Sequence, residues 1–473
     1  MNSLINIGYI ILVFVLGGAI ISGNLPLMAL CVYLSLFLNL TYAVKQFKKR
    51  FVFLCFNLTF FTFLVGQMLL ADLSFVLDED MLFLSEFSDK TQKHIYICLF
   101  LSLISVYIGY CYFENKQKRS KIELFNFSDN TILRLRELSK TLMYFFFVFA
   151  LAENVEKALF VQQAGYAGYY TDFHSSLPFF VSRLSRFYEY SFFLYLATLP
   201  KKKDCLKPLL LFFVLGFMTL GYGQRNGLVL NTLFVFIYFI FRDYYKFYGH
   251  NEVWLTKRIK YGILIGLPFA LVFLLVFGYS RAGESLEGNL SFSEMLFAFF
   301  YYQGTSYRLI GYDLELANQF PSSFPYSLGY IIDLYEQNPL FKLFGVYPVY
   351  ESHSVEAALY GHNYGDVITY LQDARAYTNG YGLGSCYIAE IFHDFGYVGV
   401  IVINFIYGVI IASLNKLALK NVWYLFVFFS AISNILYAPR SAALYFLSQV
   451  LTVTYLVYMF IMYKLSQKEV KTN

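Results

Sequence analysis

Seven arginines stand apart from the stretches in which most of the basic residues of this chain cluster. An arginine guanidinium is planar and can hold a phosphate through two parallel hydrogen bonds, whereas a lysine acts as a point charge. The clusters elsewhere are mostly lysine, which suits segments that need only positive charge. The separate arginines therefore predict a site for an anionic, phosphorylated substrate, and they are Arg183, Arg186, Arg225, Arg281, Arg308, Arg375 and Arg440.

Three of these arginines lie at junctions between apolar stretches. Arg225 is in GYGQRNG, Arg281 in GYSRAGE and Arg440 in YAPRSA, each beside a tight turn marked by Gly or Pro. A single arginine at such a junction can simply extend its guanidinium to lipid headgroups. Three at the same depth favour a clamp for a pyrophosphate group. The secondary candidates for substrate binding are Arg183, Arg186, Arg308, Asp373, Arg375 and Tyr377.

Three further side chains are candidates for a catalytic base. Glu390 lies in GLGSCYIAEIFHDFGYVGV, with His393 and Asp394 one turn away on the expected helix. A carboxylate there can act as a general base, or it can merely pair with an arginine. His353 and His362 flank the expected short helix SVEAALY. Either imidazole could deprotonate a hydroxyl or contact phosphate, or serve only as a hydrogen-bonding surface group.

The elements that position these residues are expected to be membrane-spanning helices. The chain has 473 residues, of which 58% are hydrophobic and only 14% charged, and its mean hydropathy is +0.53. Apolar runs long enough to cross about 30 Å of hydrocarbon recur along it. We expect an all-α polytopic membrane protein with twelve spans, over residues 4–22, 25–44, 51–72, 94–114, 139–160, 178–199, 206–222, 224–243, 259–279, 396–414, 421–438 and 442–464.

The basic clusters give the orientation of these spans. They fall in every second connection, so the positive-inside rule places those connections and both termini in the cytoplasm. The expected division is nine spans in residues 1–279, one large extracytoplasmic loop in 280–393, and three spans with a cytoplasmic tail in 394–473. The loop contains EMLFAFFYY, which is too short to cross and fits a re-entrant or interfacial helix. We expect further short helices in the rest of the loop, packed over the outer membrane face.

Several function classes lack their motifs in this sequence. The six cysteines are not spaced as a disulfide framework or a zinc site, and the basic stretches lack nucleic-acid-binding motifs. No nucleotide-binding motif is present. We therefore expect no metal, no cofactor and no nucleic-acid partner. An enzyme acting outside the membrane would need a donor delivered by the membrane, and a polyprenyl pyrophosphate-linked sugar supplies both a leaving group and an anion for arginines.

The same stretches resemble those of a known family. NGYGLGSCYIAEIFHDFGYVGVIVINFIYGV is similar to the closing-loop motif of the Wzy-type oligosaccharide repeat-unit polymerases, in which a carboxylate leads into a span that starts with FGxxG. GYGQRNGLVLNTLFVFIYF and YAPRSAALYF resemble their outer turns with arginine. The resemblance covers residues 221–445 in pieces. One departure is that no Gly follows eleven residues after Arg225, Arg281 or Arg375, as it does in the outer loops of some members.

This resemblance implies a membrane glycosyltransferase with a GT-C-like fold. Such an enzyme polymerises undecaprenyl-pyrophosphate-linked oligosaccharide repeat units into O-antigen, capsule or exopolysaccharide at the outer face of the bacterial inner (plasma) membrane. By position, Arg225, Arg281 and Arg440 would bind the pyrophosphate, and Glu390 or a loop histidine would assist the acceptor hydroxyl. The implied partners are the lipid-linked oligosaccharides, membrane lipids, a chain-length regulator and a flippase.

Two other functions stay open at this point. A related ligase would pass a finished glycan to another surface acceptor, with similar arginines and a loop histidine. A flippase or transporter would instead show inverted repeats, broken spans and polar residues near the midplane. The spans here are apolar in the middle, and the polar residues concentrate at the outer rim. That pattern favours the transferases.

Overall fold

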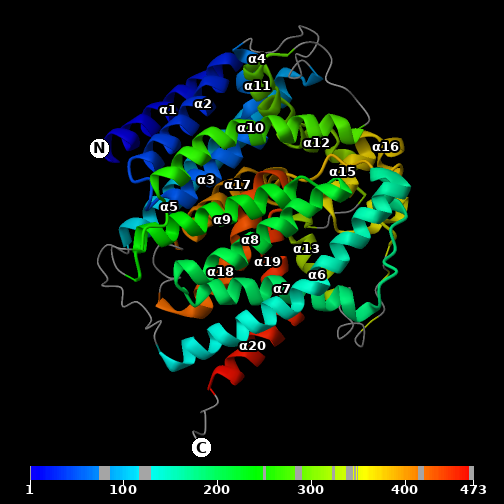
Figure 1. Ribbon diagram of the computed structural model, residues 1–473. Coiled ribbons are helices and arrows are strands. Elements are labelled where there is room, and N and C mark those ends of the chain that lie inside the picture. The colour runs from blue at the N-terminus through cyan, green and yellow to red at the C-terminus, as the bar shows by residue number, and fades with distance from the viewer. Residues whose placement is uncertain are drawn as a thin grey trace, which may run out of the picture. The chain divides into compact units, whose positions relative to one another are not determined.

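The computed structural model of the protein shows helices throughout the residues that it describes (Figure 1). No strand occurs within those residues, as the sequence predicts. The described residues are 2–73, 86–116, 129–248, 252–282, 290–321, 325–336, 345, 348, 350–413 and 420–467.

Nine helical segments in the described ranges are long and apolar enough to cross a membrane. Each matches one of the twelve spans expected from the sequence. They are Ser3–Ser22, Leu25–Lys45, Phe51–Asp72, Asp89–Lys116, Lys202–Tyr222, Asn226–Tyr245, Lys257–Arg281, Tyr387–Ser413 and Val422–Arg440.

The other three expected spans are helical but are not among these nine segments. Residues 139–160 lie within one long helix, α6 (Asn130–Thr171), and residues 178–199 correspond to α7 (Phe179–Ala197). Charged side chains interrupt the apolar stretch of both helices. The last expected span is divided between α19 (Tyr445–Val450) and α20 (Val453–Gln467), and α20 alone has only 15 residues.

Contacts between residues group the chain into two compact units. Unit 1 comprises Met1–Lys118, Thr256–Ala412 and Leu436–Leu444, and unit 2 comprises Arg119–Leu255, Ser413–Ile435 and Tyr445–Asn473. The units interleave along the sequence, so they differ from the expected division into spans, loop and spans. That division concerns sidedness in a membrane and stays a prediction.

Unit 1 contains six of the nine candidate spans and part of a seventh. Helices α1 and α2 lie side by side (Figure 1). A π-helix, η1, interrupts the third span, a feature often found at functional sites. The elements are α1 (Asn2–Ser22), α2 (Leu25–Val44), α3 (Phe51–Phe60), η1 (Phe61–Val65), α4 (Gly66–Asp72), α5 (Asp89–Lys116), α10 (Lys257–Ala282) and α17 (Tyr387–Ser413).

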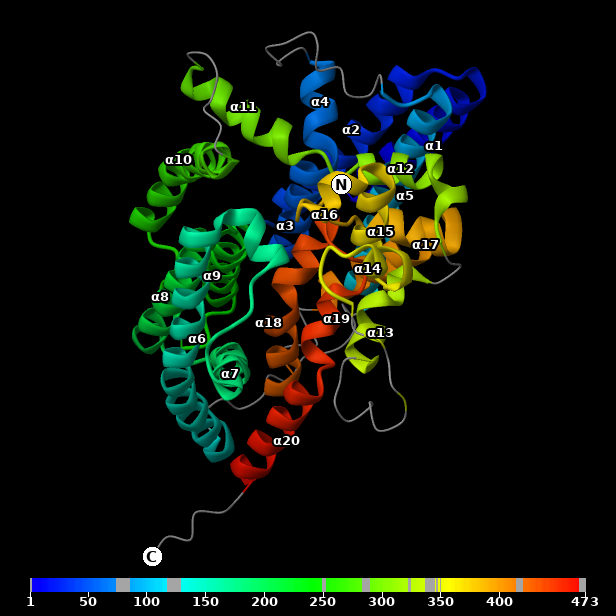
Figure 2. The ribbon, with the colours of Figure 1, turned by 90° about the vertical axis from the view of Figure 1, so that its right-hand side faces the viewer.

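Short helices form the polar part of unit 1, which comprises the described residues of 290–378 and the turn that holds Arg440. EMLFAFFYY lies in α11, which begins with a capping box between Ser291 and Glu294. Ser354, Asn363 and Asp373 cap α14, α15 and α16 in the same region (Figure 2). The elements are α11 (Phe292–Gln303), α12 (Arg308–Glu315), η6 (Ala317–Gln319), η7 (Tyr326–Leu328), α13 (Gly329–Glu336), α14 (Val355–Tyr360), α15 (Tyr364–Gln372), α16 (Ala374–Thr378) and η10 (Ala438–Arg440).

Unit 2 is built on α6 and α7, which pack against each other. Its other elements are α8 (Lys202–Met218), η5 (Thr219–Tyr222), α9 (Asn226–Tyr245), most of α18 (Val422–Tyr437), α19 and α20.

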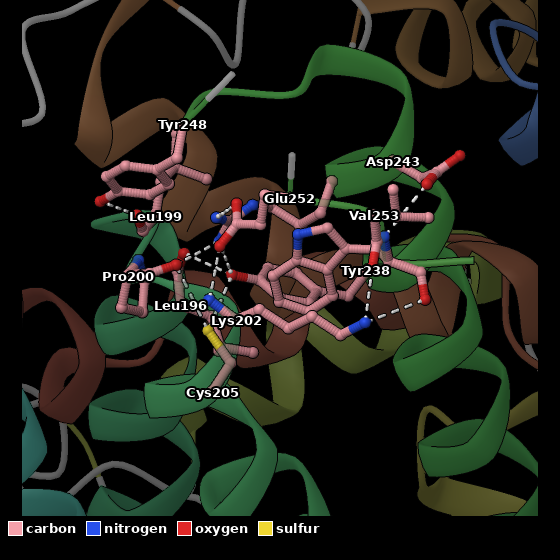
Figure 3. Close-up of polar contacts among 12 residues, drawn as sticks. Leu196, Leu199, Pro200, Lys202, Cys205, Tyr238, Asp243, Tyr248, Glu252 and Val253 are labelled. Atoms are coloured by element: carbon pink, nitrogen blue, oxygen red, sulfur yellow. Dashed lines mark hydrogen bonds and ion pairs between the residues drawn. The ribbon is translucent and has the colours of Figure 1, made fainter. Parts of the chain in front are cut away.

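A buried arginine fixes the end of α9 in unit 2. Arg242 is 0% exposed, donates to Pro200 O at 2.7 Å and to Tyr238 Oη at 2.8 Å, and pairs with Glu252 at 3.2 Å. Figure 3 shows Pro200, Tyr238 and Glu252 converging around this point. Lys202 reaches the same loop by donating to Val253 O at 2.6 Å. A buried charge persists only with such partners, so this arginine has a structural role.

Candidate functional site

The start of α17 carries the motif residues that the sequence singled out. Gly396 has φ 60° and ψ −158°, a conformation open essentially to glycine alone, and it separates Tyr387–Phe395 from the rest of the helix. A Cβ on Gly399 would lie 2.3 Å from Phe395 Cβ. Both glycines of the FGxxG motif are therefore needed for local backbone geometry. The kink gives the first two turns of α17 a direction of their own.

Glu390 lies in these first turns and is 1% exposed. Its Oε1 accepts a hydrogen bond from Ser385 Oγ at 2.5 Å, and its Oε2 accepts one from Ala443 N at 2.7 Å. Both carboxylate oxygens are thus engaged by groups of unit 1. The contact with Ala443 ties α17 to the segment that follows Arg440.

His393, one turn later, forms a pair with a carboxylate that the sequence analysis did not select. His393 Nδ1 lies 2.9 Å from Asp313 Oδ1, and Tyr364 Oη donates to the same oxygen at 3.0 Å. Asp313 is 2% exposed, and its burial raises the pKa of its carboxyl, while the hydrogen bond from His393 opposes that rise. The sequence feature that could have identified Asp313 is its position on the apolar face of α12, whose buried residues include Leu309 and Ile310.

Aromatic rings surround the imidazole of His393. The ring centroids of Phe320, Tyr326 and Tyr364 lie 4.3, 5.3 and 6.2 Å from that of His393. The neighbouring Asp394 accepts hydrogen bonds from Tyr326 N at 3.0 Å and from the following amide at 2.8 Å. The loop before α13 is therefore fixed to α17 through Asp394.

The two loop histidines occupy different surroundings in unit 1. His362 Nδ1 lies 3.1 Å from Asp333 Oδ1, which forms a second His–Asp pair. His353 has a left-handed backbone (φ 57°), and its Nδ1 lies 2.9 Å from Tyr377 O. Burial lowers the pKa of His353 and raises the pKa of nearby Asp366 to about 7. The Asp366 carboxyl can therefore exchange a proton near neutral pH.

Arg440 and Arg281 both lie near the end of α11 within unit 1. Arg440 Nη1 donates to Gln303 O at 3.3 Å, and its Cζ is 5.7 Å from the ring of Phe63 in the π-helix. Arg281 ends α10, where the ring of Tyr279 lies 5.7 Å from that of Tyr302. Because Tyr302 precedes Gln303, Arg440 and the last turn of α10 both contact the same end of α11.

The remaining arginines are distributed over both units. Arg308 begins α12 in unit 1, and its Nη1 lies 3.9 Å from Glu86 Oε1. Arg225, at the start of α9, and Arg183 and Arg186, both exposed on α7, belong to unit 2. Of the three arginines predicted to form a clamp, Arg281 and Arg440 belong to unit 1 and Arg225 belongs to unit 2.

The secondary candidates near the end of the polar segment lie on α16. Arg375 is exposed, and Asp373 caps the helix by accepting from Ala376 N at 2.8 Å. Tyr377 is 0% exposed, with its ring 4.9 Å from that of His353. The Tyr377 ring therefore packs against the imidazole of His353. Among the residues that the structure describes, no group of three or more His, Cys, Asp and Glu side chains is placed to hold a metal ion.

A comparison with protein families gives a match that covers nearly the whole chain. The family model described as O-antigen polysaccharide polymerase Wzy matches residues 4–471. No curated protein and no solved structure matches the chain. The match includes the first six expected spans, where the sequence motifs alone gave no specific resemblance. With its helical architecture, its membrane-capable helices and its FGxxG kink, the chain belongs to the Wzy family of O-antigen polysaccharide polymerases.

Proposed function

We propose that this protein transfers a growing glycan from undecaprenyl pyrophosphate onto a lipid-linked repeat unit at the outer face of the bacterial inner membrane. Family membership supports the polymerising reaction. The observation that carries the proposal is that unit 1 contains both His–carboxylate pairs and two of the predicted pyrophosphate-binding arginines, Arg281 and Arg440. Acid–base groups and arginines are the two requirements of a metal-free transfer from a pyrophosphate donor.

The topology that we propose has twelve crossings, a GT-C-like arrangement and both termini in the cytoplasm. The alternation of basic clusters supports this orientation. It places the polar segment of unit 1 outside, where a lipid-linked donor would arrive without any nucleotide. A chain-length regulator and a flippase are the proposed partner proteins, because repeat units must be delivered to this face and the product limited in length.

In this proposal the arginines stabilise the departing pyrophosphate. As the sugar–oxygen bond breaks, negative charge accumulates on the leaving group, and guanidinium groups held in place lower the energy of that state. Arg225, Arg281 and Arg440 are the proposed primary ligands. The secondary ligands are Arg183, Arg186, Arg308, Asp373, Arg375 and Tyr377.

The acceptor hydroxyl needs a base, for which the sequence named Glu390, His353 and His362. His362 carries its own carboxylate partner, and His353 is held by a backbone carbonyl. Glu390 would have to give up one of two hydrogen bonds to reach a substrate. We propose that Glu390 positions α17 and that an imidazole accepts the proton.

Replacement of Glu390 by glutamine tests this assignment. The Gln amide can accept from Ala443 N and donate to Ser385 Oγ, so both contacts of the carboxylate survive. We expect polymer yield within about threefold of wild type, whereas loss of a general base typically costs about 100-fold or more. The yield would be measured on immunoblots at matched protein level. An intact protein with a 100-fold lower rate would instead make Glu390 the base.

The direct test of the function is incubation of the purified protein with a defined undecaprenyl-pyrophosphate-linked repeat unit. We expect a ladder of products of increasing length together with released undecaprenyl pyrophosphate. A ligase would transfer the glycan once to a different acceptor, and a flippase would release no pyrophosphate lipid. Either result would contradict the proposal.

A further inference from the structure

The pair of His393 and Asp313 is assigned no role by the sequence motifs or by the family match. It joins two segments 80 residues apart, since Asp313 lies on α12 and His393 on the first turns of α17. Such a pair forms only when the tertiary fold brings the two helices together. Its geometry is that of a base held by an orienting carboxylate.

The hydrogen bond fixes which imidazole nitrogen is available. An ionised carboxylate can only accept hydrogen bonds, so Nδ1 of His393 carries the proton that faces Asp313 at 2.9 Å. In the neutral ring Nε2 is then the basic atom. Among the described residues, no hydrogen bond engages Nε2, and the His393 side chain is 16% exposed. Nε2 is therefore the nitrogen that can accept a proton from a substrate.

The carboxylate is itself held in one orientation. Tyr364 Oη donates to Asp313 Oδ1 at 3.0 Å, and Asp313 is 2% exposed. Tyr364 belongs to α15, so three separate helices of unit 1 meet at this oxygen. A carboxylate locked by two donors stabilises an imidazolium without changing its own position, which is the arrangement a general base requires.

The surroundings of the ring suit a sugar. Phe320 and Tyr326 lie beside the imidazole, with centroids 4.3 and 5.3 Å from it. Aromatic rings with polar edges are the usual lining of a site that must accept both the apolar face and the hydroxyls of a ligand. The ionisable groups facing His393 are Asp313 on α12, Asp394 on α17, and Tyr326 and Tyr364 on the elements packed against it.

We propose that His393 is the general base for the acceptor sugar hydroxyl and that Asp313 and Tyr364 position it. This inference rests on the proposed function. His393 Nε2 takes the hydroxyl proton while the hydroxyl oxygen forms a bond to the anomeric carbon of the donor. The bond from that carbon to the pyrophosphate oxygen breaks, and undecaprenyl pyrophosphate leaves with the electron pair. Asp313 offsets the charge of the resulting imidazolium, which returns its proton to solvent.

The test compares purified wild type with His393→Gln, Asp313→Asn and Tyr364→Phe, using a defined lipid-linked repeat unit. We expect His393→Gln to lower kcat about 100-fold or more with little change in KM, since a base acts in the transition state. Asp313→Asn should retain part of the rate and move the acid limb of the pH–rate profile to lower pH, because the imidazolium loses its partner. Tyr364→Phe should have the smallest effect. His174→Gln, in an exposed loop of unit 2, is the matched control and should match wild type.

The outcomes separate this inference from the function on which it rests. If wild type makes no polymer from the repeat unit, the proposed function fails. If wild type polymerises and a stably folded His393→Gln keeps more than a third of kcat, the inference fails. Should His393→Gln prove unstable in thermal unfolding, Asp313→Asn decides: an unchanged pH–rate profile in that variant overturns the assignment, and a displaced acid limb supports it.

Discussion

Replacement of Gly408 by alanine should remove most of the folded protein from the membrane. A Cβ at this position of α17 would lie 2.2 Å from Val106 O and 2.7 Å from Tyr110 N of α5. These are backbone atoms, so no side-chain rotation relieves the contact, and the two helices must separate. Gly109 on α5 makes the reciprocal approach, because its Cβ would lie 2.0 Å from Phe405 O. Small residues allow such close crossing of membrane helices, and overpacking costs at least about 1–3 kcal/mol.

The measurement is the amount and the thermal midpoint of the protein purified in detergent. Gly408→Ala and Gly109→Ala should both lower the midpoint and the yield severalfold. Gly262→Ala on α10 is the matched control, because its Cβ would meet nothing within 4 Å. That control should be neutral or slightly stabilising, since alanine favours helix over glycine. A Gly408→Ala protein with the yield and midpoint of wild type would contradict the close crossing.

This crossing holds the part of α17 that follows the Gly396 kink against α5. α5 and α17 are further joined by a hydrogen bond from Asn404 Nδ2 to Ser102 Oγ at 3.2 Å. Tyr387 Oη donates to Asn404 Oδ1 at 2.6 Å, which links the crossing to the first turn of α17. His393 lies between Tyr387 and the Gly396 kink. The site is therefore supported from the membrane-spanning part of unit 1.

Hydropathy was sufficient to predict the nine membrane-capable helices of the described residues, because length and apolar composition are local properties. It was not sufficient where charged residues enter a helix, as in α6 and α7, or where a helix is broken, as between α19 and α20. There the outcome depends on which side chains find partners within the protein. In α6, for example, Glu153 accepts a hydrogen bond from Ser185 Oγ of α7. Sequence alone does not reveal such pairing in advance.

The candidate site shows the same limit. The FGxxG glycines and the carboxylate before them were visible as a motif, since their spacing along the chain is short. The partner of His393 was not visible, because Asp313 is 80 residues away and stands in an unremarkable stretch, YRLIGYDLE. Arginines at turns could be named individually. Their distribution over two units could not be read from the sequence, because it depends on which helices pack together.

Replacement of Arg440 by alanine should abolish polymer while the protein remains in the membrane. Arg440 is half-buried, and its guanidinium makes one hydrogen bond within the described residues, to Gln303 O, which is long at 3.3 Å. A guanidinium with spare donors is suited to a bidentate contact with phosphate. Removing such a ligand should raise KM for the lipid-linked donor and lower kcat, because charge develops on the leaving group in the transition state.

Two further variants decide whether this effect comes from substrate binding. Arg440→Lys keeps the charge but loses the planar fork, so it should retain an intermediate activity. Arg258→Ala removes an exposed arginine from the start of α10 in the same unit and should leave the polymer ladder unchanged. If Arg440 served only to anchor α11 through Gln303, the alanine variant would show a lower thermal midpoint with an unchanged KM. A full-length ladder from Arg440→Ala at wild-type protein level would remove it from the pyrophosphate site, because a guanidinium that stabilises the departing group cannot be lost without slowing that departure.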